Sequence, residues 1–185
     1  MDVKDFVKVF DNYIGLEQIA HLIKWLNTQN FTEANTVGGL NRDIRKAGEL
    51  QLVKNSDSMS NVHWSNFLAS KFIQLIKDYE KNYKERTNVE SIQEIIALKY
   101  TEGDYYKVHS DNCFNFPRTL SVILFLNDDY KGGQVTFKCP KTFENLLSVP
   151  PKSGRVIMFP SNFMFPHVVE NIDEGLRYSI VSWIR

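Results

Sequence analysis

The sequence predicts a mainly β fold, a double-stranded β-helix (jelly roll) core with flanking N-terminal α-helices against one of its sheets. Up to about residue 90 the apolar residues repeat with the 3.6-residue period of helices, whereas after it they alternate with a period of two. The second half also holds seven short runs rich in β-branched and aromatic residues, separated by Gly, Pro, Asn or Asp. Such a series of short strands is typical of a two-sheet antiparallel barrel.

Length and composition limit the organisation of the chain. Its 185 residues suffice for one domain with a substantial core, and we expect a single domain, with a helical and lid part over about 1–90 and a β core over about 91–185. A hydrophobic content of 43% excludes a disordered chain. Lys plus Arg number 22, as do Asp plus Glu, so the net charge is 0, which argues against a dedicated nucleic-acid binder.

The cellular compartment of the protein is predicted from the apolar content of its first residues and from the number and spacing of its cysteines. The opening MDVKDFVKVF has no long apolar core, and no run approaches the roughly 18 apolar residues of a membrane span, so we expect a soluble cytoplasmic protein. Cys113 and Cys139 are too few for a disulfide scaffold and lack the CxxC spacing of zinc sites. We expect both to be small buried residues.

Two helices and a polar loop are expected in the first half. Helical spacing of apolar residues predicts one helix over 16–29 and another over 65–83. Residues 35–60 contain Gly38-Gly39 and many polar side chains, which predicts a loop or lid with one strand pair. Arg42 and Arg45 in this segment are candidate substrate contacts, and a solvated mobile loop is the alternative.

The seven strands expected after residue 90 are joined by the turn sequences TEGD, NDDYKGG, PPKSG and NIDEG. They are Ile92–Tyr100, Tyr105–Ser110, Thr119–Leu126, Gln134–Lys138, Arg155–Phe159, Pro166–Val169 and Leu176–Ile184.

Three residues in this region form a candidate metal site. His109 and Asp111 are two positions apart, so on an extended strand their side chains project from the same face. His167 lies on a later expected strand. Two imidazoles and one carboxylate are the set that occupies one face of an Fe(II) octahedron and leaves three positions open. A His-x-Asp pair alone is a weak signal, and a surface strand end is the alternative interpretation.

Arg177 is a candidate anion-binding residue. Alternation along the last expected strand puts Arg177, Ser179, Val181 and Trp183 on one face. If that face lines the barrel interior, the guanidinium needs an anionic partner, because an unpaired buried cation is very costly. A bound carboxylate would provide it through a bidentate contact. An Arg at the exposed start of the strand is the alternative.

Taken together, these residues resemble the 2-oxoglutarate and Fe(II)-dependent dioxygenases, specifically their prolyl 4-hydroxylase-like branch, from about Ile92 to the C terminus. The motifs that carry the resemblance come in the family's order and spacing. They are YTEGDYYKVHSD over 100–111, Arg118 leading into Ser121, FLND over 125–128, GGQVTF over 132–137, PKSG over 151–154, Phe159, His167, Arg177 ten residues later and Trp183 six beyond that.

The resemblance implies roles for these positions. His109, Asp111 and His167 match the iron ligands, and Arg177 matches the anchor for the distal carboxylate of 2-oxoglutarate. Tyr100, Ser121 and Trp183 match positions around the co-substrate, and Tyr106 matches an aromatic position of the pocket. Phe125 stands where many members have a Tyr that helps to hold the co-substrate carboxylate, so one hydrogen-bond donor is missing there or is replaced by another hydroxyl.

The activity implied is hydroxylation of a prolyl residue in a peptide or protein, with Fe(II), 2-oxoglutarate and dioxygen, and with ascorbate as a possible reductant. The retained Asp111 favours hydroxylation, since halogenating members lack this carboxylate. The alternatives are the same chemistry on a free amino acid, a small molecule or methylated nucleic acid, and a non-catalytic jelly-roll module that binds metal or carbohydrate. The nucleic-acid branch usually has a second Arg where this chain has Trp183, and the neutral charge also disfavours it.

Overall fold

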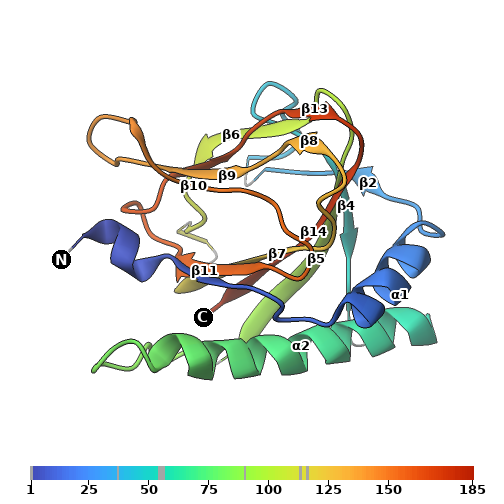
Figure 1. The fold of residues 1–185 in the computed structure, drawn as a ribbon, viewed down its shortest axis with the longest axis horizontal. Coiled ribbons are helices and arrows are strands. Elements are labelled where there is room, and N and C mark those ends of the chain that lie inside the picture. The colour runs from blue at the N-terminus through green and yellow to red at the C-terminus, as the bar shows by residue number, and fades with distance from the viewer. Residues whose placement is uncertain (1, 37, 54–56, 90, 113, 116) are drawn as a thin grey trace.

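The fold is a two-sheet β-barrel with two helices packed against the outside of the larger sheet, as seen in a computed structural model (Figure 1). The structure describes residues 2–36, 38–53, 57–89, 91–112, 114–115 and 117–185. The larger sheet has the strand order β1-β11-β7-β14-β5-β4-β2, and the smaller sheet has the order β10-β9-β12-β6-β3. A third pair, β13-β8, lies at one end. The predicted jelly-roll class with N-terminal helices is confirmed.

The helical elements are η1 (Val3–Phe6), α1 (Leu16–Leu26) and α2 (Met59–Glu80). The strands are β1 (Lys8–Phe10), β2 (Thr32–Glu33), β3 (Arg45–Lys46), β4 (Gly48–Gln51), β5 (Ile92–Tyr100), β6 (Tyr105–His109), β7 (Leu120–Phe125), β8 (Lys131–Gly132), β9 (Val135–Lys138), β10 (Asn145–Val149), β11 (Val156–Pro160), β12 (His167–Val169), β13 (Ile172–Glu174) and β14 (Arg177–Ile184).

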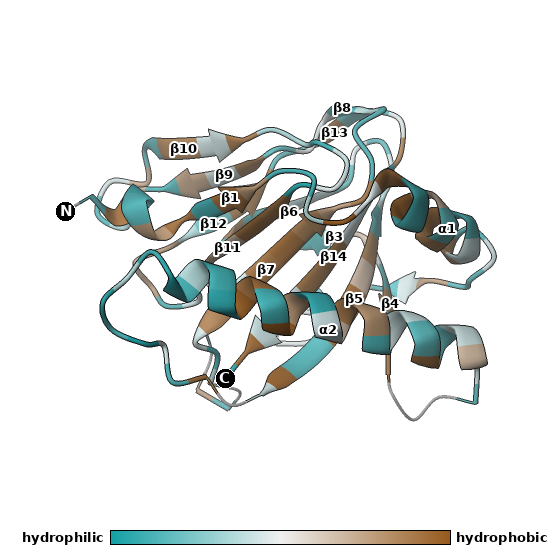
Figure 2. Cartoon of the chain, turned by 60° about the horizontal axis from the view of Figure 1, so that its bottom comes forward, coloured by the Kyte–Doolittle hydropathy of each residue, from teal (hydrophilic) through white to brown (hydrophobic). Residues whose placement is uncertain are grey.

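The long helix α2 covers the outer face of the larger sheet (Figures 1 and 2). It begins six residues before the predicted start, because the Ser58 side chain accepts a hydrogen bond from the Asn61 N–H and caps the first turn. Its buried face, which includes Leu68, Phe72 and Leu75, shares one apolar core with α1 and with the outward side chains of the sheet. Figure 2 shows the apolar strands β7, β14 and β5 behind this helix.

The last strand, β14, separates two different environments. Tyr178, Ile180 and Ile184 belong to the core under the helices. Arg177, Val181 and Trp183 face the space between the two sheets, where they line a cavity. The alternation predicted for this strand is therefore confirmed, and it is the Arg177 face that lies inside the barrel.

The seven predicted strands correspond to β5, β6, β7, β9, β11, β12 and β14. The strand β10 was not predicted, because its NLLSV sequence is half exposed at the edge of the smaller sheet and does not alternate. The predicted loop over 35–60 holds more order than expected. Within it β3 pairs with β6 and β4 pairs with β5, so this short segment joins both sheets.

Two further expectations concern composition. Cys139 is partly exposed, so its predicted burial is wrong: the residue lies in the turn after β9, where its N–H donates to the Glu144 carbonyl. Cys113 lies outside the described residues. Among the described helices, none has the length and apolar character needed to cross a membrane.

Neighbouring positions on α2 provide a test of this packing. Phe72 is 0% exposed, whereas Ile73 is 51% exposed. We expect Phe72→Ala to lower the free energy of unfolding by about 3–5 kcal/mol, because it leaves a cavity between helix and sheet. Ile73→Ala should change it by less than about 1 kcal/mol. Urea unfolding followed by circular dichroism measures both, and equal effects would contradict the packing described.

Candidate functional site

A cavity of about 300 Å³ lies between the two sheets of the barrel. Its walls come from both sheets and from the segment that joins them. Side chains that line it include Arg45, Glu94, Tyr100, Tyr106, His109, Asp111, Arg118, His167, Arg177 and Trp183. Most of the predicted site residues thus meet in one enclosed space, although they lie far apart in the sequence.

The two histidines are brought together by strand pairing. β6 and β12 are antiparallel neighbours, and His109 and His167 lie directly opposite one another in their register. Asp111 follows the end of β6. Its carboxylate oxygens lie 3.4 Å from His109 Nε2 and 3.9 Å from His167 Nε2. One ligand atom from each of the three residues lies within 4.8 Å of the other two, close enough to share one metal ion.

Hydrogen bonds orient both imidazoles for metal binding. His109 Nδ1 lies 2.8 Å from the Lys107 carbonyl, and His167 Nδ1 lies 3.1 Å from the Phe165 carbonyl. A carbonyl accepts from Nδ1–H, which leaves the lone pair on Nε2 of a neutral ring. Both Nε2 atoms face Asp111. The backbone therefore selects the tautomer that a metal requires.

Burial and charge set the protonation states of this cluster. Burial, reinforced by the nearby His109, lowers the pKa of His167 to about 4, so this ring is neutral near pH 7. Burial also acts to raise the pKa of Asp111, but the neighbouring imidazoles of His167 and His109 and a hydrogen bond from Ser121 outweigh it and hold that pKa well below its usual value. An ionised Asp111 and a neutral His167 are the states in which these two residues bind a divalent cation.

Two neighbours hold Asp111 in place. The Ser121 hydroxyl hydrogen-bonds to the Asp111 carboxylate and lies 2.8 Å from Ser161 Oγ. Arg118 donates to the Asp111 carbonyl at 3.0 Å and to Glu94 at 3.1 Å, and its guanidinium lies 3.6 Å from the centre of the Trp183 ring. Ser121 is thus a support for the carboxylate and is not part of the cavity lining.

Arg177 is a buried cation whose charge is not balanced by the described residues. It is 1% exposed and donates from Nη1 to the Gly133 carbonyl at 2.9 Å, with no acidic partner among those residues. Its Nε has no hydrogen-bond partner there, and neither does the Ser179 hydroxyl. A buried cation with free donors is costly unless an anion binds. A dicarboxylate with one end at Arg177 and the other at the metal fits this arrangement.

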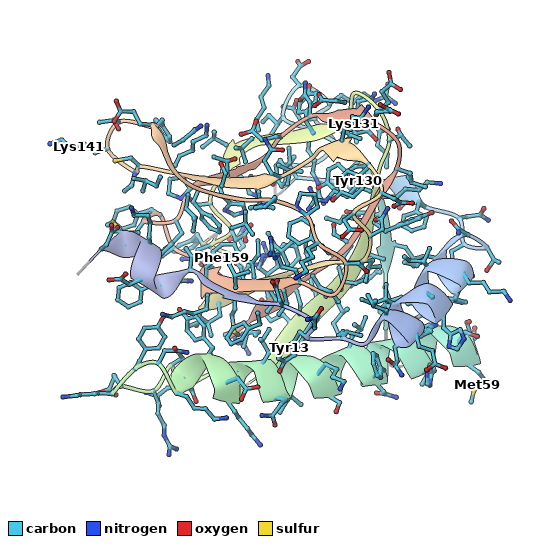
Figure 3. The ribbon with its side chains drawn as sticks, in the orientation of Figure 1. Tyr13, Met59, Tyr130, Lys131, Lys141 and Phe159 are labelled. Atoms are coloured by element: carbon cyan, nitrogen blue, oxygen red, sulfur yellow. The ribbon has the colours of Figure 1, made fainter. Side chains whose placement is uncertain are left out.

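The Tyr130 hydroxyl is a further free donor beside Arg177. It is buried without a partner among the described residues, and burial raises the pKa of Tyr130 to about 12 despite the opposing charge of Arg177. Gly133 lies between the two side chains: a Cβ there would come within 3.0 Å of the Tyr130 ring and 3.4 Å of Arg177 Cδ. Phe125, the residue that lacks the expected hydroxyl, has its ring 5.0 Å from the same guanidinium. Figure 3 labels Tyr130 next to β8.

The candidate substrate residues occupy different places. Tyr106 lines the cavity and stacks on His109 at a centroid distance of 3.5 Å. Arg45 is 6% exposed, lies over the Tyr106 ring at 4.8 Å and also lines the cavity. Arg42, in contrast, is exposed, pairs with Glu33 and is not part of the cavity lining. The structure therefore brings Tyr106 and Arg45 to the metal cluster and leaves Arg42 on the surface.

Sequence reasoning gave no role to Arg118, Tyr130 and Ser179. Arg118 lies between two of the family motifs, and Ser179 lies on the same strand face as Arg177, so both had a signal that a closer interpretation could have used. Tyr130 had none, because only the folded turn after β7 brings it to Arg177.

Comparisons with known proteins agree with this site. The family model of the 2OG-Fe(II) oxygenase superfamily matches residues 95–185. A PKHD-type hydroxylase of Rippkaea orientalis is 28% identical over 174 residues, which cover 90% of this chain and 72% of that protein. Mouse prolyl 3-hydroxylase 3 is 33% identical over 92 residues, covering 42% of this chain. The match spans only 13% of the length of that relative.

Solved structures show the same fold over almost the whole chain. A Pseudomonas putida prolyl-4-hydroxylase superposes with a TM-score of 0.77 at 18% identity, covering 97% of this chain and 92% of that one. A Trichoplax adhaerens prolyl hydroxylase, in complex with a peptide fragment of the hypoxia inducible factor, superposes with a TM-score of 0.79 at 16% identity, covering 97% and 83%.

A His-Asp-His cluster facing a buried Arg inside a jelly roll defines the class of oxygenases that depend on a non-haem iron and a 2-oxo acid. The family match and the relatives make the assignment specific. Over its matched residues 95–185 this chain is a 2OG-Fe(II) oxygenase, with Fe(II) and 2-oxoglutarate as its cofactors, and its whole fold is like that of the prolyl 4-hydroxylases.

The metal assignment can be tested without turnover. We expect His167→Ala to weaken Mn(II) binding at least about a hundredfold, because one of three ligands is lost; replacing even a supporting residue costs about 10–100-fold. His21→Ala is the matched control, since His21 is exposed on α1. Calorimetric titration with Mn(II) measures both affinities. Equal affinities in the two variants would rule out His167 as a ligand.

Proposed function

We propose that this protein hydroxylates a prolyl residue of a peptide or protein and couples that reaction to the oxidative decarboxylation of 2-oxoglutarate. One molecule of dioxygen supplies both oxygen atoms: one enters the new hydroxyl group and the other enters succinate, with release of carbon dioxide. The observation that carries the proposal is the placement of His109, Asp111 and His167 in one cavity with the unpaired Arg177.

In this proposal the three clustered side chains hold Fe(II) through two Nε2 atoms and one carboxylate oxygen. Bound there, Fe(II) supplies the redox chemistry that activates dioxygen. The protein contributes a fixed ligand geometry. Two ligands lie on hydrogen-bonded strands, and Ser121 and Arg118 hold the third.

The co-substrate site extends from the metal to Arg177. The guanidinium pairs with the distal carboxylate, and the free hydroxyls of Ser179 and Tyr130 donate to the same group. Tyr100 and Trp183 form walls of this space. Tyr130 thereby replaces the hydroxyl that is absent at Phe125.

The substrate class rests on the relatives and on the cavity wall nearest the metal. The relatives include prolyl 3-hydroxylases, and the structural neighbours include a prolyl 4-hydroxylase. Tyr106 and Arg45 line the cavity that holds the metal cluster, and in this proposal both contact the substrate. A cytoplasmic location and a contact through Arg42 stay predictions.

The direct test is turnover with proline-containing peptides. The protein is supplied with Fe(II), ascorbate, 2-oxoglutarate and air, and succinate and peptide mass are measured. We expect succinate and a peptide that gains one oxygen at proline, with both products lost in Asp111→Ala and retained in His21→Ala. Succinate without any oxygenated peptide, across a broad peptide library, would contradict the prolyl substrate. Fragmentation and NMR of the product identify the hydroxylated ring position.

The role of Tyr130 gives a second test, which uses binding alone. We expect Tyr130→Phe to weaken 2-oxoglutarate binding to the Mn(II)-loaded protein about tenfold, because a hydrogen bond to a charged group contributes about 1.5–3 kcal/mol. Affinity for Mn(II) itself should not change. Tyr13→Phe, which removes a hydroxyl on the helix side of the molecule, is the control. An unchanged 2-oxoglutarate affinity in Tyr130→Phe would show that this hydroxyl does not contact the co-substrate.

A further inference from the structure

An apolar groove of about 590 Å³ lies outside the barrel, next to the metal cluster. It is lined by Val108, His109, Ser110, Pro140, Phe143, Phe163 and Pro166. None of these residues is Lys, Arg, Asp or Glu. Three chain segments contribute to it: the end of β6, the turn between β9 and β10, and the connection from β11 to β12.

Large apolar side chains in the lining of the groove are exposed to solvent. Val108 is 41% exposed, Phe143 is 59% exposed and Phe163 is 74% exposed. Single exposed apolar residues are common, but a concave group that includes two Phe and two Pro is typical of a binding surface.

The two aromatic side chains are presented by defined turns. Phe143 has a φ of 59°, a left-handed conformation that is unfavourable for a bulky residue, and its N–H donates to the Cys139 carbonyl. Phe163 lies in a turn where Asn162 accepts from the Met164 and Phe165 N–H groups. Backbone strain in an exposed aromatic residue persists where function requires it. Figure 3 shows this turn, marked by Lys141, far from Met59 at the start of α2.

The groove and the active-site cavity adjoin one another, because His109 and Ser110 line both. When the reactive residue of a peptide lies at the metal cluster, residues next to it in sequence are therefore within reach of the groove. A free amino acid or other small substrate would be too short to occupy both spaces.

We infer that this groove is a subsite for the peptide or protein substrate and that it binds an apolar side chain, aliphatic or proline, close in sequence to the reactive residue. The inference rests on the proposed function for the peptide class of the substrate. A lining that is mostly apolar and holds no Lys, Arg, Asp or Glu favours an apolar occupant, because a polar side chain would lose hydration there.

The test measures peptide binding to the protein loaded with Mn(II) and 2-oxoglutarate, so that no turnover is needed. The probes are short fluorescent peptides with a central proline in a Ser/Gly background, in which one Leu is moved through the flanking positions. We expect peptides with Leu at one or two of these positions to bind at least about tenfold more tightly than the all-polar peptide, because burial of a Leu side chain removes a large apolar surface from water. Fluorescence anisotropy measures these affinities.

Variants then locate the effect. Phe143→Asn and Phe163→Ser, separately and together, should remove most of the Leu preference, and Asn tolerates the left-handed conformation at 143. Met59→Ser, which replaces an exposed apolar residue at the other end of the molecule, should keep it. Mn(II) binding and urea unfolding confirm that each variant is folded. Equal binding of all peptides by the unmodified protein, or a full Leu preference in the double variant, would overturn the inference.

The same peptides separate this inference from the proposed function. A Leu preference that depends on Phe143 and Phe163, without oxygen added to any proline, would support the groove and contradict prolyl hydroxylation. Hydroxylation that is independent of every flanking Leu would support the proposed function and contradict the groove.

Discussion

The antiparallel pairing of β6 with β12 is the interaction on which the site depends. These strands are separated by 57 positions between His109 and His167, yet their register places the two imidazoles directly opposite one another. Because side chains alternate along a strand, a shift of this register by one residue would turn His167 to the other face and dissolve the cluster. The bulge between His167 and Val169 lies at the end of the same ladder. Metal geometry in this protein is thus a property of sheet register.

The second constraint is electrostatic. The barrel interior holds Arg45, Arg118 and Arg177 together with Glu49, Glu94 and Asp111. Arg118 pairs with Glu94, and the Arg45 guanidinium lies 4.0 Å from the Glu49 carboxylate. Among the described residues, Arg177 has no acidic partner and the Asp111 carboxylate has no Lys or Arg partner. In the proposed function, a divalent cation compensates Asp111 and a dicarboxylate compensates Arg177. The cavity is therefore organised so that the two unpaired charges are those that the iron and the co-substrate neutralise.

Much of this could be predicted from the sequence, for physical reasons that differ between elements. The alternation of β14 put Arg177, Ser179, Val181 and Trp183 on one face, because side chains of a strand repeat with a period of two. It left open which face lies inside, since neither face is purely apolar, and the structure shows that it is the Arg177 face. The site histidines followed from residue type and motif spacing. Tyr130 could not be assigned, since its role depends on a side-chain contact with Arg177 that only the folded chain provides. The order within residues 35–60 was underestimated because its short strands gain their stability from partners elsewhere in the chain.

The segment over residues 45–51 also limits how far the chain can be shortened without loss of the fold. β3 completes the smaller sheet and β4 extends the larger one, so the chain over 45–51 closes a seam between the two sheets. The family match begins at residue 95, after this seam and after both covering helices. A fragment limited to the matched half would keep the whole His-Asp-His cluster. It would leave a sheet edge unpaired and would expose the apolar outer face of the larger sheet to water. The smallest part of this chain that can fold by itself therefore includes residues before 95, which lie outside the family match.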